Sequence, residues 1–135
     1  PAPGDGQALA RRADGVDSNV SAVDFGIAAA ATPGASNGGP PPGCDVAVDP
    51  VWINEFLPNP AGADGTALAE FVELLSGAES PIDFAGWKLQ SAGKPGEWTT
   101  RYTFPEDTIL DAGAFFVVGE ANVADADLVA ELLSL

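Results

Sequence analysis

Four short apolar runs, separated by turn-forming residues, are the feature of this sequence that most constrains its fold. They occupy residues 52–56, 70–74, 82–89 and 115–118, and Gly, Pro or Asp residues follow each run. Runs of this length and spacing, with no long helical pattern between them, are typical of strands in an all-β sandwich. We therefore predict an all-β fold in which two sheets pack face to face.

Individual strands can be placed from the alternation of side chains. Residues 98–104 alternate with a period of two and carry their aromatic residues on one face, which predicts a half-buried strand. Residues 69–75 and 114–119 are apolar on both faces, which predicts strands in the middle of a sheet. Further strands are predicted at residues 51–56, 82–90 and 108–110.

The last stretch, residues 122–135, carries a different pattern. Apolar side chains recur at i, i+1, i+4 and i+5 from Leu128, as they do on one face of a helix. Asp125 and Asp127 lie near the start of this pattern, where a helix dipole favours anions. A short C-terminal helix is therefore predicted.

The charge balance limits the partners of the chain. Among its 135 residues, 20 are acidic and 5 are basic, so the formal net charge is −15. Such a field repels phosphate backbones and anionic membrane surfaces, so we expect no binding to nucleic acid. No apolar run is long enough to span a bilayer, and no signal peptide is recognisable. The acidic residues are interpreted mainly as a means of keeping a β-protein soluble.

A Gly- and Pro-rich stretch divides the chain. Residues 38–50 have the composition of a linker, and their Pro run favours an extended and stiff connection. The single cysteine, Cys44, lies in this stretch and is interpreted as an incidental thiol, since one cysteine forms neither an intrachain disulfide nor a cysteine-based metal site. The remaining parts are residues 1–37 and the strand-rich residues 51–135.

Five segments of the strand-rich part resemble a known family. Residues 54–60, 70–74, 82–89, 102–105 and 109–118 are similar, in this order, to the opening of a lamin tail domain of the bacterial type. The resemblance implies an immunoglobulin-like β-sandwich, which agrees with the strand pattern. It also implies a supporting role, because bacterial members commonly accompany secreted hydrolases and nucleases. Eukaryotic relatives bind proteins and DNA, but the charge of −15 argues against DNA binding here.

The front of the chain resembles the end of such a domain. Residues 10–19, 24–25 and 32–37 carry this second resemblance, so a closing segment (1–37) precedes the opening and main part (51–135). Two explanations stay open: a slice across the junction of two tandem copies, which we prefer, or a permuted arrangement. Either one leaves a sheet edge that the front segment could fill, within one chain or in a strand-swapped homodimer.

The best cation candidate is the loop from Asp14 to Asp24. Asp14, Asp17, Ser18, Asn19 and Asp24 supply oxygen atoms at short spacing, and Gly15 allows a turn, which is what a hard cation such as Ca²⁺ requires. The alternative is an Asx-turn loop in which the carboxylates accept hydrogen bonds from backbone amides. The spacing is not that of an EF-hand, so no metal ligand is assigned.

Catalytic groups are sparse. Glu70 and Glu73 could be read as a carboxylate pair, but the chain has no His to act as a partner, and one of them is expected on a sheet face near Arg101 or Lys88. Ser36 and Ser76 cannot belong to a Ser-His-Asp triad for the same reason. No catalytic residue and no cofactor is therefore assigned.

The three tryptophans, Trp52, Trp87 and Trp98, could form a platform for stacking sugar rings, although burial in the β-core is the more common outcome. The sequence as a whole indicates a non-catalytic, secreted or cell-surface module of a larger bacterial protein, which binds other domains of that protein or cell-surface proteins. A calcium- or polysaccharide-binding module is the alternative.

Overall fold

The computed structural model describes residues 3–37, 51–62, 67–94 and 96–130, and it is almost entirely β-structure. The only helix in these ranges is the single turn α1 (Ser21–Asp24). The strands are β1 (Leu9–Arg11), β2 (Phe25–Ile27), β3 (Val51–Leu57), β4 (Phe71–Ser76), β5 (Ile82–Asp83), β6 (Lys88–Ala92), β7 (Trp98–Thr103), β8 (Ile109–Leu110), β9 (Phe115–Gly119) and β10 (Leu128–Val129). The predicted all-β class is confirmed.

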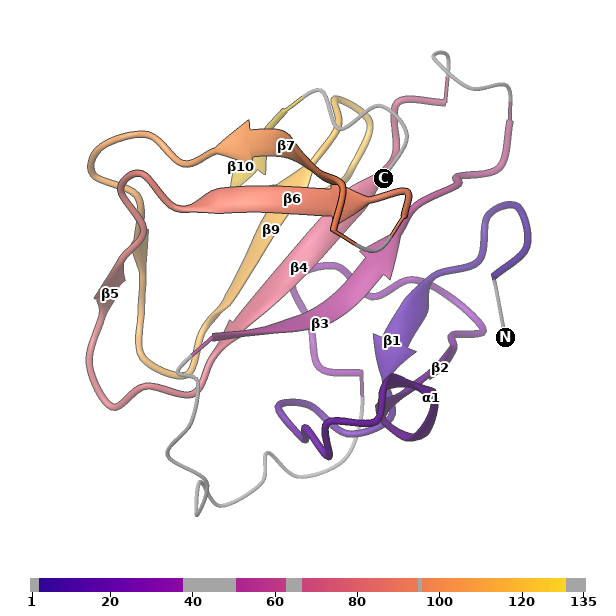
Figure 1. Cartoon of the computed structure of the whole chain (residues 1–135), viewed down its shortest axis with the longest axis horizontal. Helices are drawn as coiled ribbons and strands as arrows, with labels where there is room; N and C mark the ends of the chain where they lie inside the picture. Colours follow the sequence, from indigo (N-terminus) through magenta and orange to yellow (C-terminus); the bar gives the residue numbers. More distant parts are fainter. Residues whose placement is uncertain (1–2, 38–50, 63–66, 95, 131–135) are drawn as a thin grey trace.

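One large sheet and two ribbons form the two layers of the sandwich (Figure 1). The large sheet has six strands in the order β10-β9-β4-β3-β1-β2, and only the β10–β9 pair is parallel. The opposing layer consists of the antiparallel pairs β5–β8 and β6–β7. In Figure 1, β6 and β7 cross over the strands of the large sheet, and this crossing encloses the main core.

The main core lies between the two layers. Val72 and Leu74 of β4 and Val118 of β9 face Phe84, Leu89, Phe104 and Leu110 from the ribbon layer. Phe84 is fully buried, and its ring centroid lies 5.2 Å from that of Phe104. Burial of a side chain of this size contributes about 2 kcal/mol, so these aromatic residues hold the layers together.

The opposite face of the large sheet is also covered. Phe71 and Val117 are buried there with Ala8 and Leu57, beneath residues of the loops around Ala28, Val123 and Ala126. Every residue of β4 is therefore buried. This confirms the prediction that residues 69–75 contain a central strand, because apolar side chains on both faces require cover on both sides.

The front part of the chain completes the large sheet. Leu9 of β1 lies opposite Phe56 of β3, and β2 extends the sheet by pairing with β1. Segments from both sides of residues 38–50 thus belong to one sheet within one chain. The sequence left open whether the front segment fills the sheet edge, and in this structure it does.

Three sequence expectations are wrong. The helix predicted over residues 122–135 is not formed in its described part, because Leu128 and Val129 pair with β9 instead; residues 131–135 lie outside the described ranges. The strand predicted over residues 82–90 is two strands, β5 and β6, separated by a turn in which Gly86 has a φ of +76°. The aromatic face of residues 98–104 is not uniformly buried, since the side chain of Trp98 is 65% exposed.

Candidate functional site

A β-bulge in β3 creates the main polar feature of the sandwich. The register shifts between Ile53 and Glu55, so Glu55 lies opposite Glu73 of β4 while Asn54 has no partner in the ladder. An extra residue of this kind turns two neighbouring side chains toward the same face. Asn54, Glu55 and Glu73 are all fully buried there.

Asn54 joins the buried acids to each other. Its side-chain amide donates to Glu73 Oε1 at 2.8 Å and to Asp14 Oδ1 at 3.1 Å. Asp14 comes from the loop after β1 and is 3% exposed. We call Asp14, Glu55 and Glu73, together with Asn54, the carboxylate cluster.

Residues 32–37, which we call the latch segment, close the carboxylate cluster with backbone amides. The N–H of Thr32 donates to Glu55 Oε2 at 3.0 Å, and the N–H of Gly34 donates to Glu73 Oε2 at 2.7 Å. The N–H of Asn37 donates to Asp14 Oδ1 at 3.0 Å, and the Ser36 hydroxyl donates to the same carboxylate. Each of the three buried acids therefore accepts a backbone hydrogen bond from one short segment.

The sequence of the latch segment explains its shape. The N–H of Ala35 donates to the carbonyl oxygen of Thr32 at 3.0 Å, and Gly34 has a φ of +77°. A turn with Pro at its second position and a residue of positive φ at its third is a type II turn, which requires Gly there. The Thr-Pro-Gly sequence at residues 32–34 thus presents alternate N–H groups to the cluster.

Burial controls the protonation of the cluster. The pKa of Glu73 is raised to about 7, mainly by burial and in part by the charges of Glu55 and Asp14, against the opposing effect of the hydrogen bonds from Asn54 and Gly34. Burial also raises the pKa of Glu55, which the hydrogen bonds from Thr32 oppose. At neutral pH, Glu73 is therefore present in both its protonated and its ionised form.

A strongly raised pKa marks a candidate catalytic acid or base, but only where a substrate can reach the group. Glu73 has no exposed surface, and its two oxygens are engaged by Asn54 and Gly34. Asn54 Oδ1 is buried without a hydrogen-bond partner among the described residues. Within the same residues, no group of three or more His, Cys, Asp or Glu side chains is arranged to hold a metal ion. In this structure the acids of the carboxylate cluster are therefore bound by groups of their own chain.

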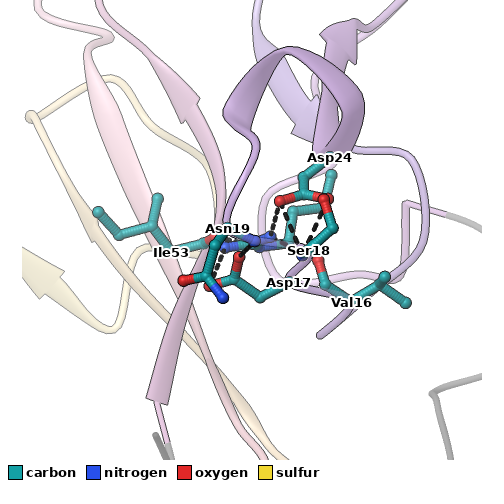
Figure 2. A network of polar contacts seen from close by, with 7 residues as sticks. Val16, Asp17, Ser18, Asn19, Asp24 and Ile53 are labelled. Atoms are coloured by element: carbon teal, nitrogen blue, oxygen red, sulfur yellow. Dashed lines mark hydrogen bonds and ion pairs between the residues drawn. The ribbon is translucent and has the colours of Figure 1, made fainter. Parts of the chain in front are cut away.

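A second polar network surrounds Arg11, the last residue of β1. Figure 2 shows residues of this network from the loop that follows β1, among them Val16, Asp17 and Asp24. The guanidinium donates to the carbonyl oxygens of Ile53 at 2.8 Å and Val16 at 2.5 Å. It lies 3.8 Å from the carboxylate of Asp24 and 3.7 Å from that of Asp17, and it stacks over the Phe25 ring at 4.6 Å. A cationic side chain thus occupies the centre of this loop.

Asp24 is held in its ionised form. Its carboxylate accepts hydrogen bonds from the hydroxyl of Ser18 at 2.6 Å and from the N–H of Ser18 at 3.0 Å. These bonds, helped by the charge of Arg11, lower the pKa of Asp24 in spite of the opposing effect of burial. In Figure 2 both oxygens of Asp24 point toward Ser18.

The acids of the candidate calcium loop do not share one site. Asp14 turns toward the carboxylate cluster, whereas Asp17 and Asp24 lie around Arg11. Asp17 accepts a hydrogen bond from the N–H of Asn19 at 2.8 Å. This bond is an Asx-turn, which is the alternative that the sequence offered for this loop.

The remaining candidates lie apart. The bulge places Glu73 beside Asn54. Glu70 precedes β4 and donates its N–H to Glu120 Oε2 at 3.0 Å. Ser76 is buried. Cys44 lies outside the described residues.

The tryptophans do not form one platform in the core. The side chains of Trp98 and Trp87 are 65% and 46% exposed, so the expectation that these rings are buried is wrong. Both belong to the ribbon layer: Trp98 begins β7, and Trp87 lies in the turn before β6. Trp52 on β3 is half-buried and lines an open groove of about 520 Å³ together with Phe25 and Phe56.

The geometry defines a β-sandwich module whose buried ionisable groups are bound by its own chain. The family model of the Lamin Tail Domain matches residues 46–133, which is more than half of the sequence. The chain therefore belongs to the lamin tail domain family of structural, immunoglobulin-like interaction modules, and the predicted immunoglobulin-like fold is confirmed.

No curated protein and no solved structure matches the chain significantly. None of the helices in the described ranges has the length and apolar character needed to cross a membrane.

Proposed function

We propose that the chain is a non-catalytic structural and interaction module of a larger bacterial protein that is secreted or displayed at the cell surface. The observation that carries this proposal is the closed carboxylate cluster. Glu55 and Glu73, whose pKa values are raised, both accept hydrogen bonds from the latch segment, and so does Asp14.

The chemistry of the rest of the chain supports the same function. The sequence has no His, and its single cysteine precedes β3 in the linker. Asp17 and Asp24 hold Arg11 in place. A module of this kind contributes binding surface and spacing, and the attached domains contribute the chemistry.

The net charge of −15 favours proteins as the binding partners of the module. It repels DNA and anionic lipid surfaces at physiological ionic strength. Its partners are other domains of the parent protein or proteins of the cell surface. Support for the location comes from the bacterial lamin tail domains that the sequence resembles, which accompany secreted enzymes.

The location is tested by protease treatment of intact cells that produce the full-length protein. Cleavage of the module in intact cells, with a cytoplasmic marker left uncut, is the expected result. Protection of the module until the cells are lysed would contradict the proposed location.

The non-catalytic role is tested by Glu73→Gln in the full-length protein. This change preserves the shape of the side chain and removes the titratable proton, but it leaves one acceptor oxygen in place of two. The activity of any attached catalytic domain, measured per folded molecule, should stay unchanged. Glu79→Gln at an exposed position is the matched control. A selective loss of turnover in Glu73→Gln would refute the role.

The exposed tryptophans favour a second candidate function, polysaccharide binding. Trp98 and Trp87 offer accessible ring faces, and such rings stack on sugars. Affinity electrophoresis of the wild type, Trp98→Ala and Trp87→Ala in gels containing bacterial polysaccharides tests this candidate. Retardation that is lost in either variant would support it, and equal mobility of all three proteins would remove it.

The calcium alternative is tested by the melting temperature in Ca²⁺ and in chelator, since a ligand that binds only the folded form stabilises it.

A further inference from the structure

The N-terminal segment, residues 3–37, contacts the rest of the sandwich as a separable unit. Its strand β1 adds to the edge of β3, with Ala10 opposite Glu55. Beyond the ladder, the N–H of Gly6 donates to the carbonyl oxygen of Asn59 at 2.7 Å, and the side chain of Arg11 donates to the carbonyl oxygen of Ile53 at 2.8 Å. These contacts are all non-covalent and join residues far apart in the sequence.

The carboxylate cluster recognises the N-terminal segment through its backbone. Thr32 and Gly34 are bound by Glu55 and Glu73 through their N–H groups, which are placed by the type II turn. The N–H of Asn37 donates to Asp14 within the segment itself. Asp14 brings a carboxylate from the same segment to Asn54. Any second copy of the chain presents the same donors in the same conformation.

Without the N-terminal segment, the surface that receives it would expose unpaired backbone groups and apolar side chains to solvent. Removal of the segment would open the edge of β3, a strand that presents unpaired N–H and C=O groups. It would also uncover apolar side chains packed with Ala8, including Leu57, Phe71 and Val117. Glu55 and Glu73 would lose the donors of Thr32 and Gly34. The receiving surface is therefore stable only when a segment of this sequence is bound to it.

The connection between the two units permits more than one source for that occupant. Residues 38–50 join Asn37 to β3, and seven of these 13 residues are Gly or Pro, which is a linker composition. The contacts described above are the same whether the N-terminal segment and the surface that receives it belong to one chain or to two chains. Exchange of an identical element between protomers is a low-cost route to a dimer.

We propose that the N-terminal segment of one copy docks on β3 and on the buried Glu55 and Glu73 of a second copy, so that two chains exchange these segments reciprocally. The inference rests on the proposed function, because it names a second copy of the chain as one partner of the interaction module. Each chain then donates one segment and receives one, and both receiving surfaces are covered.

Disulfide trapping between two singly substituted chains tests the exchange. In a Cys44→Ser background, one chain carries Leu9→Cys and the other carries Phe56→Cys, at positions that lie opposite each other in the β1–β3 ladder. Cα atoms of opposed antiparallel residues are about 4.5–5.5 Å apart, which suits a disulfide. The two proteins are unfolded together in urea, refolded at high concentration, oxidised and separated on a non-reducing gel.

A covalent dimer that contains both chains is the expected result, since only docking between copies brings the two cysteines together. Leu9→Cys mixed with Val129→Cys is the control, because Val129 lies on β10 at the opposite end of the sheet order and is 64% exposed. The double variant Leu9→Cys/Phe56→Cys in one chain shows that the geometry allows the bond.

Absence of the mixed dimer above the control, with the double variant oxidised, would overturn the exchange. If the double variant does not form its bond, light scattering of the wild type decides the question. A species of twice the 13.6 kDa chain mass at high concentration supports the exchange, and a monomer throughout overturns it. These results are independent of protease access in intact cells and of the Glu73→Gln activity, so failure here leaves the proposed function standing.

Discussion

The raised pKa of Glu73 makes the stability of the sandwich depend on pH in a direction opposite to that of most acidic groups. Its pKa is about 7 in the folded protein, compared with an ordinary value of 4.5. Between these values the folded protein binds more protons than the unfolded chain, so the free energy of unfolding decreases as the pH rises. The contribution is fully present below about pH 4.5 and is lost as the pH passes through about 7.

The magnitude follows from the burial of Glu73. A tenfold change in proton affinity corresponds to about 1.4 kcal/mol, so the rise from 4.5 to about 7 corresponds to about 3 kcal/mol. The raised pKa of Glu55 acts in the same direction. Asp24 acts in the opposite direction, because its lowered pKa stabilises the fold above 3.8 and this contribution is lost on further acidification.

Urea unfolding followed by tryptophan fluorescence between pH 4.5 and 8 measures this effect. Glu73→Gln should flatten the decline by about 3 kcal/mol, whereas the exposed control Glu79→Gln should retain it. Comparison with the control removes the general repulsion that accompanies a net charge of −15. A wild type whose stability is constant or increases from pH 5 to 7.5, or a Glu73→Gln variant with an unchanged slope, would refute the reasoning.

Three further changes test other parts of the structure by urea unfolding. Gly34→Ala should cost about 1 kcal/mol, because Gly34 has a φ of +77° although a Cβ there meets no atom within 4 Å; no loss would contradict the type II turn. Arg11→Met should cost about 3 kcal/mol, since Asp24 remains buried without its cation, and a neutral result would contradict the role of Arg11. Phe84→Ala should cost about 3–5 kcal/mol, whereas Trp98→Ala should change stability by less than about 0.5 kcal/mol, because Phe84 is fully buried and Trp98 is 65% exposed. Equal effects of the last two changes would contradict the placement of the core.

The strands that could be predicted from the sequence are those whose burial is visible locally. β4 and β9 are apolar on both faces, so a central position in the sheet follows from the residues alone. The resemblance to the lamin tail domain added the sandwich architecture, which the alternation of single strands does not specify.

The C-terminal strand could not be predicted, because it depends on a neighbour. Asp127 accepts a hydrogen bond from the N–H of Val117 at 2.7 Å, and the N–H of Ala130 donates to the carbonyl oxygen of Gly119 at 2.9 Å. These contacts draw Leu128 into the edge of β9. A helical spacing of apolar residues does not reveal that an open sheet edge lies nearby, and the tertiary contact overrides the local preference.

The carboxylate cluster was missed for a related reason. Glu73 was recognised as a candidate, but its partners lie 19 and 39 positions away in the sequence, at Asn54 and Gly34. The bulge at Asn54 has no clear signature in a run of apolar and polar residues. The Thr-Pro-Gly sequence at residues 32–34 does predict a turn, and its free N–H groups are the signal from which a buried acceptor could have been inferred.

Amide hydrogen exchange of the latch segment tests most directly whether the carboxylate cluster closes the sandwich. The N–H groups of Thr32, Gly34 and Asn37 donate to buried carboxylates, so at neutral pH they should exchange within about tenfold of the amides of β4. Exchange of these three amides at the rate of an unfolded chain, while β4 stays protected, would show that the cluster is open to solvent and would contradict its structural role.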